Sequence, residues 1–139
     1  MINADLDQFL SSGWYSEATL YLNGYTYWCE GYVVGEGNNK KHHLFVSKFR
    51  TIITNEVYTR RVIYNNEMVG FKIVFEMDCD TEDELKEEFL KAKIFDGKSF
   101  WEVEQEIAWY DEDGNPTIML EELDEATKQT ILKEINDGK

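Results

Sequence analysis

Glu17 and Glu30 are the first side chains in this 139-residue sequence whose spacing suggests chemistry. They stand at equal distances on either side of the dipeptide Asn23-Gly24. Both residues of this dipeptide tolerate positive φ, so it favours a two-residue type I′ turn between antiparallel strands. A hairpin closed by that turn places Glu17 directly opposite Glu30. Two such carboxylates can share a proton or hold a divalent cation, or they can simply extend into water near the strand ends.

Three aromatic side chains are predicted on the same face of this hairpin. Tyr21, Trp28 and Tyr32 fall on the side of the two glutamates, because side chains along a strand point alternately to the two faces. Together with Glu17 and Glu30 they form a candidate surface for a small ligand or a carbohydrate, or for an enzyme that uses carboxylates. The opposite face is the predicted core, with the cross-strand pairs Leu22–Tyr25, Leu20–Tyr27 and Ala18–Cys29.

The histidines do not form a metal site by spacing. His42 and His43 are adjacent at the start of an alternating segment that reads as a third strand, so their side chains point to opposite faces and cannot bind one metal together. We interpret them as an exposed pair.

An acidic loop near the C-terminal end superficially resembles a calcium site. Asp111, Asp113 and Asn115 have the right alternation, but the glycine is misplaced, the final glutamate is missing and a proline follows. A turn between two strands is favoured.

Cys29 and Cys79 also lack a metal-binding spacing and are expected to be reduced. The sequence therefore predicts no metal site and no cofactor.

Familiar catalytic motifs are missing from the sequence. It contains no Gly-x-Ser-x-Gly elbow, no Walker loop, no His-Glu-x-x-His and no Cys-x-x-Cys. A common hydrolase needs a base beside a nucleophile, whereas the side chains available here are carboxylates, tyrosines, two adjacent histidines and two distant cysteines. The pattern favours a protein that is not an enzyme.

The charge is distributed very unevenly. The formal net charge is −14, yet residues 1 to 70 hold seven acids and six bases, whereas residues 71 to 139 hold 21 acids and eight bases. Such an acidic half repels nucleic acid and anionic membranes and attracts basic proteins. We therefore expect no direct contact with nucleic acid or a membrane. The candidate partner-binding residues are Asp83, Glu84, Glu87, Glu121 and Glu122.

The segment 78–95 contains the clearest helix. Thr81 and Glu84 match a capping box, and Leu85, Phe89 and Ala92 recur at helical spacing to form an inner face. A terminal helix is expected over 121–136. Since the strands precede the helices, the predicted fold is α+β: one antiparallel sheet of about five to six strands, covered on one face by the two helices.

Three further elements complete the prediction. Segments 57–64 and 69–77 flank a turn and read as a second hairpin, with Phe71, Ile73, Phe75 and Met77 as an apolar stripe. Ser99 to Tyr110 suits either a helix or a strand. We favour a short helix, begun by a capping box of Ser99 and Glu102, and a strand over 107–110. A short strand over 117–120 follows.

Residues 1 to 139 are expected to form one domain, mainly β and nearly neutral up to residue 77 and helix-rich and acidic after it. The N-terminus has no signal-peptide pattern, which predicts a cytoplasmic protein. The leading function is a non-enzymatic interaction module, such as an inhibitor or a nucleic-acid mimic, that docks on a basic protein surface. The alternative is the ligand module on the aromatic face. The oligomeric state stays open.

Overall fold

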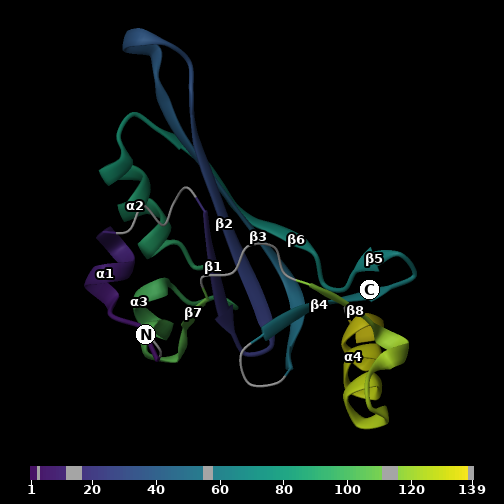
Figure 1. Cartoon of the computed structure of the whole chain (residues 1–139). Helices are drawn as coiled ribbons and strands as arrows, with labels where there is room; N and C mark the ends of the chain where they lie inside the picture. Colours follow the sequence, from purple (N-terminus) through teal and green to yellow (C-terminus); the bar gives the residue numbers. More distant parts are fainter. Residues whose placement is uncertain (3, 12–16, 55–57, 111–115, 138–139) are drawn as a thin grey trace.

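The computed structural model describes residues 1–2, 4–11, 17–54, 58–110 and 116–137. These residues form an α+β domain with eight strands and four α-helices (Figure 1). The strands are β1 Glu17–Leu22, β2 Tyr25–Val34, β3 Lys41–Thr54, β4 Tyr58–Tyr64, β5 Glu67–Met68, β6 Lys72–Cys79, β7 Ala108–Tyr110 and β8 Thr117–Met119. The helices are α1 Leu6–Ser11, α2 Glu82–Lys91, α3 Phe100–Val103 and α4 Glu125–Asp137, with the short 3-10 helices η1 Gly37–Asn39, η2 Glu104–Glu106 and η3 Leu120–Glu122. None of the helices in the described ranges has the length and apolar character needed to cross a membrane.

Strand β3 is the axis of the sheet. One of its edges pairs with β2 from residue 41 to residue 50. Its other edge is divided, because residues 42–48 pair with β6 and residues 51–54 pair with β4. The sheet therefore branches along β3, with β6 on one branch and β4, β5 and β8 on the other.

The first hairpin has the predicted register. Leu22 pairs with Tyr25, and Glu17 pairs with Glu30. Asn23 and Gly24 have φ values of 51° and 86°, as a type I′ turn requires. A side chain at residue 24 would also collide with the guanidinium of Arg50, which donates a hydrogen bond to the Gly24 carbonyl. The turn therefore needs both its backbone conformation and its lack of a Cβ.

The larger of two hydrophobic clusters, which we call the main core, lies between the sheet and α1, α2 and α3. Leu85 and Phe89 of α2 are buried against it, as the helical spacing predicts, while Ala92 is the half-buried C-cap. The Thr81 hydroxyl accepts a hydrogen bond from the Glu84 amide at 3.1 Å, which begins the helix. The main core contains Phe9, Ala18, Leu20, Leu22, Tyr27, Cys29, Leu44, Val46, Cys79, Leu85, Phe89, Leu90, Phe95, Phe100, Val103 and Ile107.

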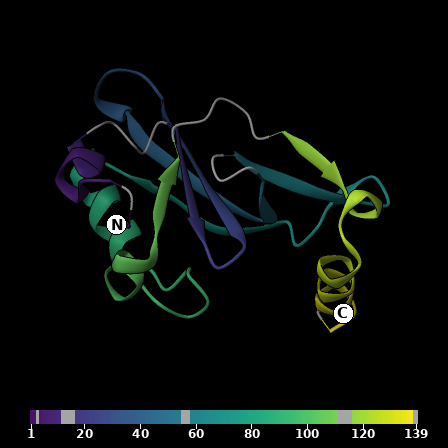
Figure 2. The same cartoon turned by 60° about the horizontal axis from the view of Figure 1, so that its bottom comes forward.

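A second cluster, the C-terminal core, lies at the other branch of the sheet. Its buried residues are Val62, Val69, Leu120 and Ile131, the last of which belongs to α4. The expectation that both helices cover one face of a single sheet is not confirmed, because α2 and α4 pack on different clusters. In both views they lie on opposite sides of the molecule (Figures 1 and 2).

The predicted second hairpin is wrong in its strand pairing. Asn65 and Asn66 form the expected turn, with φ values of 53° and 64°, but the strand that follows the turn and pairs with β4 is the two-residue β5 and not β6. Gly70 then takes φ 71° and redirects the chain, so that β6 leaves β4 and pairs with β3. The physical reason is the branch of the sheet: β4 uses residues 51–54 of this edge of β3 and leaves residues 42–48 available to β6.

The apolar stripe predicted in β6 is also interrupted. A β-bulge lies opposite Val46 and Ser47, where the pairing moves from Val46–Phe75 to Ser47–Ile73. The extra residue reverses the alternation. Phe75 and Met77 consequently pack against the main core, whereas Phe71 and Ile73 remain 50% and 44% exposed.

The segment 99–110 forms the predicted short helix followed by a strand. Ser99 and Glu102 make both hydrogen bonds of a capping box.

The prediction that β8 pairs with β7 across a turn is wrong, because β7 pairs with β1 and β8 pairs in parallel with β4. Asp111, Asp113 and Asn115 lie outside the described residues. Parallel pairing needs a long crossover, and the chain from β4 through the main core to β8 supplies one.

Candidate functional site

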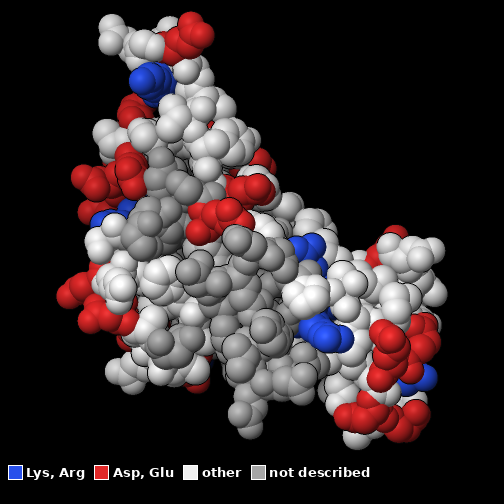
Figure 3. All heavy atoms as spheres, viewed as in Figure 1, with Lys and Arg blue, Asp and Glu red and all other residues white. Residues whose placement is uncertain are grey.

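The most strongly charged part of the molecule extends from β6 into α2. Eight acids and one base occur between residues 76 and 88. Seven of these acids are exposed, and we call them the acidic surface. They are Glu76, Asp78, Asp80, Glu82, Asp83, Glu84 and Glu87. Figure 3 shows Asp and Glu side chains gathered over the side of the molecule where α2 lies, and a second group over α4.

Helix α2 explains why Asp83, Glu84 and Glu87 face solvent. Leu85 and Phe89 hold the opposite side of the helix in the main core. None of the three acids makes an ion pair with a described residue; the α2 ion pair is Lys91 with Glu88, at 2.7 Å. Three candidate residues thus form one outward acidic strip, as predicted from helical spacing.

The β6 end of the acidic surface is partly neutralised. Lys41 forms an ion pair with Asp80, and the two side chains are 49% and 68% exposed. This contact offsets the charge of Asp80 and leaves the other acids of the surface without an ion pair to a lysine or arginine of the described residues. The α2 strip therefore carries most of the uncompensated charge.

His43 is held by two carboxylates that the sequence did not connect with it. Its Nδ1 contacts the Asp78 carboxylate, and its Nε2 lies 3.2 Å from Glu76 Oε2. The ring packs against Tyr32 at an interplanar angle of 36°, with centroids 4.9 Å apart. His43 is only 13% exposed, so the prediction of an exposed histidine pair is wrong at this position. The signal that would have found the cluster is the pairing of β3 with β6, which places His43 opposite Asp78.

Glu121 and Glu122 do not join the acidic surface. Both are exposed in η3, beside the C-terminal core and across the molecule from α2 (Figure 1). The Glu122 carboxylate accepts a hydrogen bond from the Met119 amide at 2.9 Å. Glu122 therefore has a local structural role, and the five predicted partner-binding residues divide into two separate groups.

The aromatic face contains the five residues predicted for it. Glu17 pairs with Glu30, Tyr21 pairs with Thr26, and Trp28 and Tyr32 follow on the same side of β2. Both glutamates and Tyr32 are exposed, whereas Trp28 is half-buried beneath the Arg61 guanidinium, 5.1 Å from its ring. The cavity between β5 and α4, the hollow beside it and the cavity beside Lys48 include none of the five in their linings.

Arg61 covers part of this face. Its guanidinium lies over Trp28 and also over Phe49, at 5.3 Å, and burial lowers its pKa. Neither Arg61 Nε nor Trp28 Nε1 has a hydrogen-bond partner among the described residues. Trp28 therefore serves as a packing surface for a cation instead of an open platform.

Cysteine and metal chemistry find no support in the described part of the chain. Cys29 and Cys79 are buried free thiols, and burial raises the pKa of both. A raised thiol pKa reduces the thiolate that would act as nucleophile or metal ligand. Within the described ranges, no group of three His, Cys, Asp or Glu side chains is arranged to hold a metal ion.

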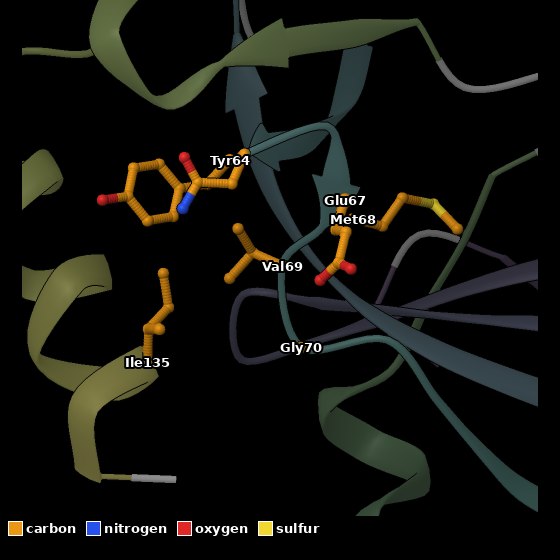
Figure 4. A pocket seen from close by; sticks show the side chains of 7 residues that line it. Tyr64, Glu67, Met68, Val69, Gly70 and Ile135 are labelled. Carbon is orange, nitrogen blue, oxygen red and sulfur yellow. The ribbon is translucent and has the colours of Figure 1, made fainter. Parts of the chain in front are cut away.

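A cavity of about 190 Å³ lies between β5 and α4. Figure 4 shows Tyr64, Val69 and Ile135 gathered around it, while Met68 points away. An adjoining hollow of about 480 Å³ is lined by Glu67, Met68, Gly70 and Phe71. Glu67 is the one charged side chain in these linings, so the two hollows offer apolar contact without a set of groups that could do chemistry.

Comparison with models of protein families, with curated proteins and with solved structures found no match.

Proposed function

We propose that this protein is a non-enzymatic interaction module that docks its acidic surface on a basic surface of another protein. The observation that carries the proposal is the outward strip of Asp83, Glu84 and Glu87, which makes no ion pair with a described residue.

The strip is more acidic than the helix itself requires. Glu82, Asp83 and Glu84 lie in the first turn of α2, where negative charge interacts favourably with the helix dipole. Glu87 lies beyond that turn. It is four residues after Asp83, where like charges destabilise a helix, and four residues before Lys91, where opposite charges stabilise one, so the helix gains little net stability from it. Lysine and arginine side chains of a partner would relieve this repulsion on binding, which is a source of affinity that solubility alone does not need.

The neighbouring edge of the sheet supports the same location. In the described part of the structure β6 pairs with β3 on one side and with no strand on the other. The exposed apolar side chains of Phe71 and Ile73 lie at the start of this edge. Free backbone groups, apolar contacts and surrounding acids are the features that an extended basic segment of a partner would use.

The test compares two variants that lose the same charge. The first is Asp83→Asn/Glu84→Gln/Glu87→Gln, and the matched control is Glu17→Gln/Glu30→Gln/Glu36→Gln, which neutralises three exposed acids elsewhere. Proteins captured from cell extract by the wild type are identified, purified and titrated against all three proteins. We expect the α2 variant to bind about tenfold more weakly or worse, because three charge contacts are lost, and the control to bind like the wild type.

Salt provides the second readout. Affinity should fall steeply as ionic strength rises, because contacts between exposed charges are screened over a Debye length of about 8 Å at physiological salt. Equal binding by all three proteins, or an association that 1 M salt leaves unchanged, would refute docking through the acidic surface. If the Glu17/Glu30/Glu36 variant lost more affinity than the α2 variant, the aromatic face would be the docking site instead of the acidic surface. A Glu121→Gln/Glu122→Gln variant tests the remaining two predicted residues.

A further inference from the structure

Three lysine side chains surround one cavity of about 290 Å³ in this acidic protein. Lys48 comes from β3, Lys72 from β6 and Lys93 from the segment after α2. Asp96 is the single acid in the lining, and Ile73, Val74 and Ile94 supply an apolar wall. Three bases against one acid is the reverse of the balance in the whole chain, where acids outnumber bases two to one.

The β-bulge in β6 creates this concentration of charge. Without the extra residue, Ile73 would lie opposite Lys48; with it, Lys72 takes that place. Like charges directly opposite one another destabilise a pair of strands. Bulges often occur beside functional sites, where they redirect a side chain. Here the bulge places Lys48 and Lys72 at the same cavity, although the repulsion between their ammonium groups destabilises the sheet.

Lys48 is fixed and neutralised, whereas the other two lysines are not. Its ammonium lies 2.7 Å from Asp96 Oδ1 and 4.4 Å from the centre of the Tyr25 ring. Asp96 is presented by a tight turn in which Asp96 and Gly97 have φ values of 55° and 82°. Lys72 and Lys93 are exposed and make no ion pair with a described residue.

The pocket therefore offers two ammonium groups that have no ion-pair partner among the described residues, beside an apolar wall; Lys93 acts on Glu102 at longer range. A phosphate monoester carries a charge of about −1.5 to −2 at neutral pH, which matches two ammonium groups. The volume is near the lower limit of about 300 Å³ for small-molecule sites, so the ligand must be small. We propose that this cavity binds the phosphate group of a small organic molecule, with Lys72 and Lys93 as its charge partners and Ile73, Val74 and Ile94 against its apolar part. This inference is independent of the acidic surface and of the protein docked there.

The experiment titrates the 139-residue chain with phenyl phosphate or with inorganic phosphate and follows binding by backbone amide NMR. Both should cause saturable shifts at Gly97 and Lys98, and phenyl phosphate should bind several-fold more tightly because it also contacts the apolar wall. Lys72→Ala/Lys93→Ala should weaken binding about tenfold or more, since both charge partners are removed. Lys72→Arg/Lys93→Arg keeps the charge and should retain most of the affinity.

The matched control is Lys40→Ala/Lys133→Ala, which removes two exposed lysines outside the cavity lining. An equal loss of affinity in the two alanine variants would show a nonspecific charge effect and overturn the proposal. Binding that does not saturate would overturn it as well. If the protein were a dimer that phenyl phosphate dissociates, the occupant would be an acidic segment of a second copy and not a small molecule.

Discussion

The main core and the C-terminal core are built on different scales. The main core buries sixteen residues, with five aromatic rings from Phe9, Tyr27, Phe89, Phe95 and Phe100 among them, and three helices pack around it. The C-terminal core buries four, and α4 contributes one of these, Ile131. Because burial of apolar surface dominates folding stability, α2 is anchored in the body of the protein while α4 is held by a small local cluster. The acidic strip of α2 therefore lies on a large buried core, whereas the acids of α4 and η3 lie beside a small one.

Arg50 joins the two regions. Its Nη1 donates to the carbonyl oxygens of Gly24 and Thr51 at 2.8 and 2.9 Å, and its Nε donates to Glu134 of α4 at 3.0 Å. A single guanidinium thus connects the first hairpin of the sheet with the terminal helix. The difference between the cores shows that α4 depends on specific polar contacts as well as on apolar burial.

Truncating one buried side chain in each core should give the largest contrast. Phe89→Ala should destabilise the whole protein by about 3–5 kcal/mol, because it leaves a large cavity among packed aromatic rings. Ile131→Ala should lower the free energy of unfolding by about 2–5 kcal/mol, and its effect should be confined to α4 and its neighbours. Native-state hydrogen exchange followed by NMR distinguishes local opening from global unfolding.

In Ile131→Ala, the amides of α4 should exchange faster while those of β1 and β2 keep their protection. Phe89→Ala should instead accelerate exchange throughout the sheet. Equal acceleration of β1, β2 and α4 in the Ile131 variant would mean that the two cores unfold as one unit. The milder Phe89→Leu and Ile131→Val variants keep the comparison measurable if an alanine variant fails to fold.

Removing the connection between the cores should have the next largest effect. Arg50→Ala should lower the free energy of unfolding by about 1.5–3 kcal/mol, because several hydrogen bonds of a largely buried cation are lost. Glu134 is 38% exposed, so Glu134→Gln should cost about 1 kcal/mol or less. Urea unfolding of both variants measures the difference. A Glu134→Gln variant as unstable as Arg50→Ala would place the energy in the ion pair and not in the contacts with the hairpin.

The sequence predicted the hairpin turn and the helix caps of this fold correctly. The Asn23-Gly24 turn, the Thr81 cap and the box of Ser99 and Glu102 each depend on residues within a few positions of one another, so their chemistry is visible in the chain itself. The outward positions of Asp83, Glu84 and Glu87 follow from the same helical period. What these acids bind stays a prediction.

The errors all concern contacts between distant segments. The pairing of β6 with β3 and the parallel pairing of β8 with β4 have no local signal, since either strand could extend a hairpin equally well. Gly70 was the one indication that the second hairpin breaks, because glycine inside a strand often marks a bend. His43 appeared exposed for the same reason: its partners Asp78 and Glu76 arrive only through the β3–β6 pairing.

The N-caps of α2 and α4 should respond differently to acid. Thr81→Ala should cost about 1 kcal/mol at any pH, since the hydroxyl does not titrate. Asp124 caps α4 by accepting hydrogen bonds from the Thr127 amide and hydroxyl, which lower its pKa. Its contribution is therefore complete above the unfolded value of about 3.9 and is lost as pH falls through the folded pKa. Thermal unfolding from pH 7 to pH 2 should show the destabilisation by Asp124→Ala disappearing in acid while that by Thr81→Ala persists. A pH-independent effect of Asp124→Ala would show that the cap acts without its charge.

Changing a charge within the acidic strip should give the smallest effect. Glu87→Gln removes the repulsion between Glu87 and Asp83 and also the attraction between Glu87 and Lys91, so it should change the free energy of unfolding by less than about 0.5 kcal/mol in low salt. Any difference should vanish in high salt, where both interactions are screened. Glu121→Gln in η3 is the control, since this acid lies outside α2. Urea unfolding at two salt concentrations measures both variants. If Glu87→Gln destabilised the protein by clearly more than this, the Glu87 carboxylate would be making a further favourable contact in the free protein, and the strip would no longer carry the uncompensated charge from which docking on a basic partner is inferred.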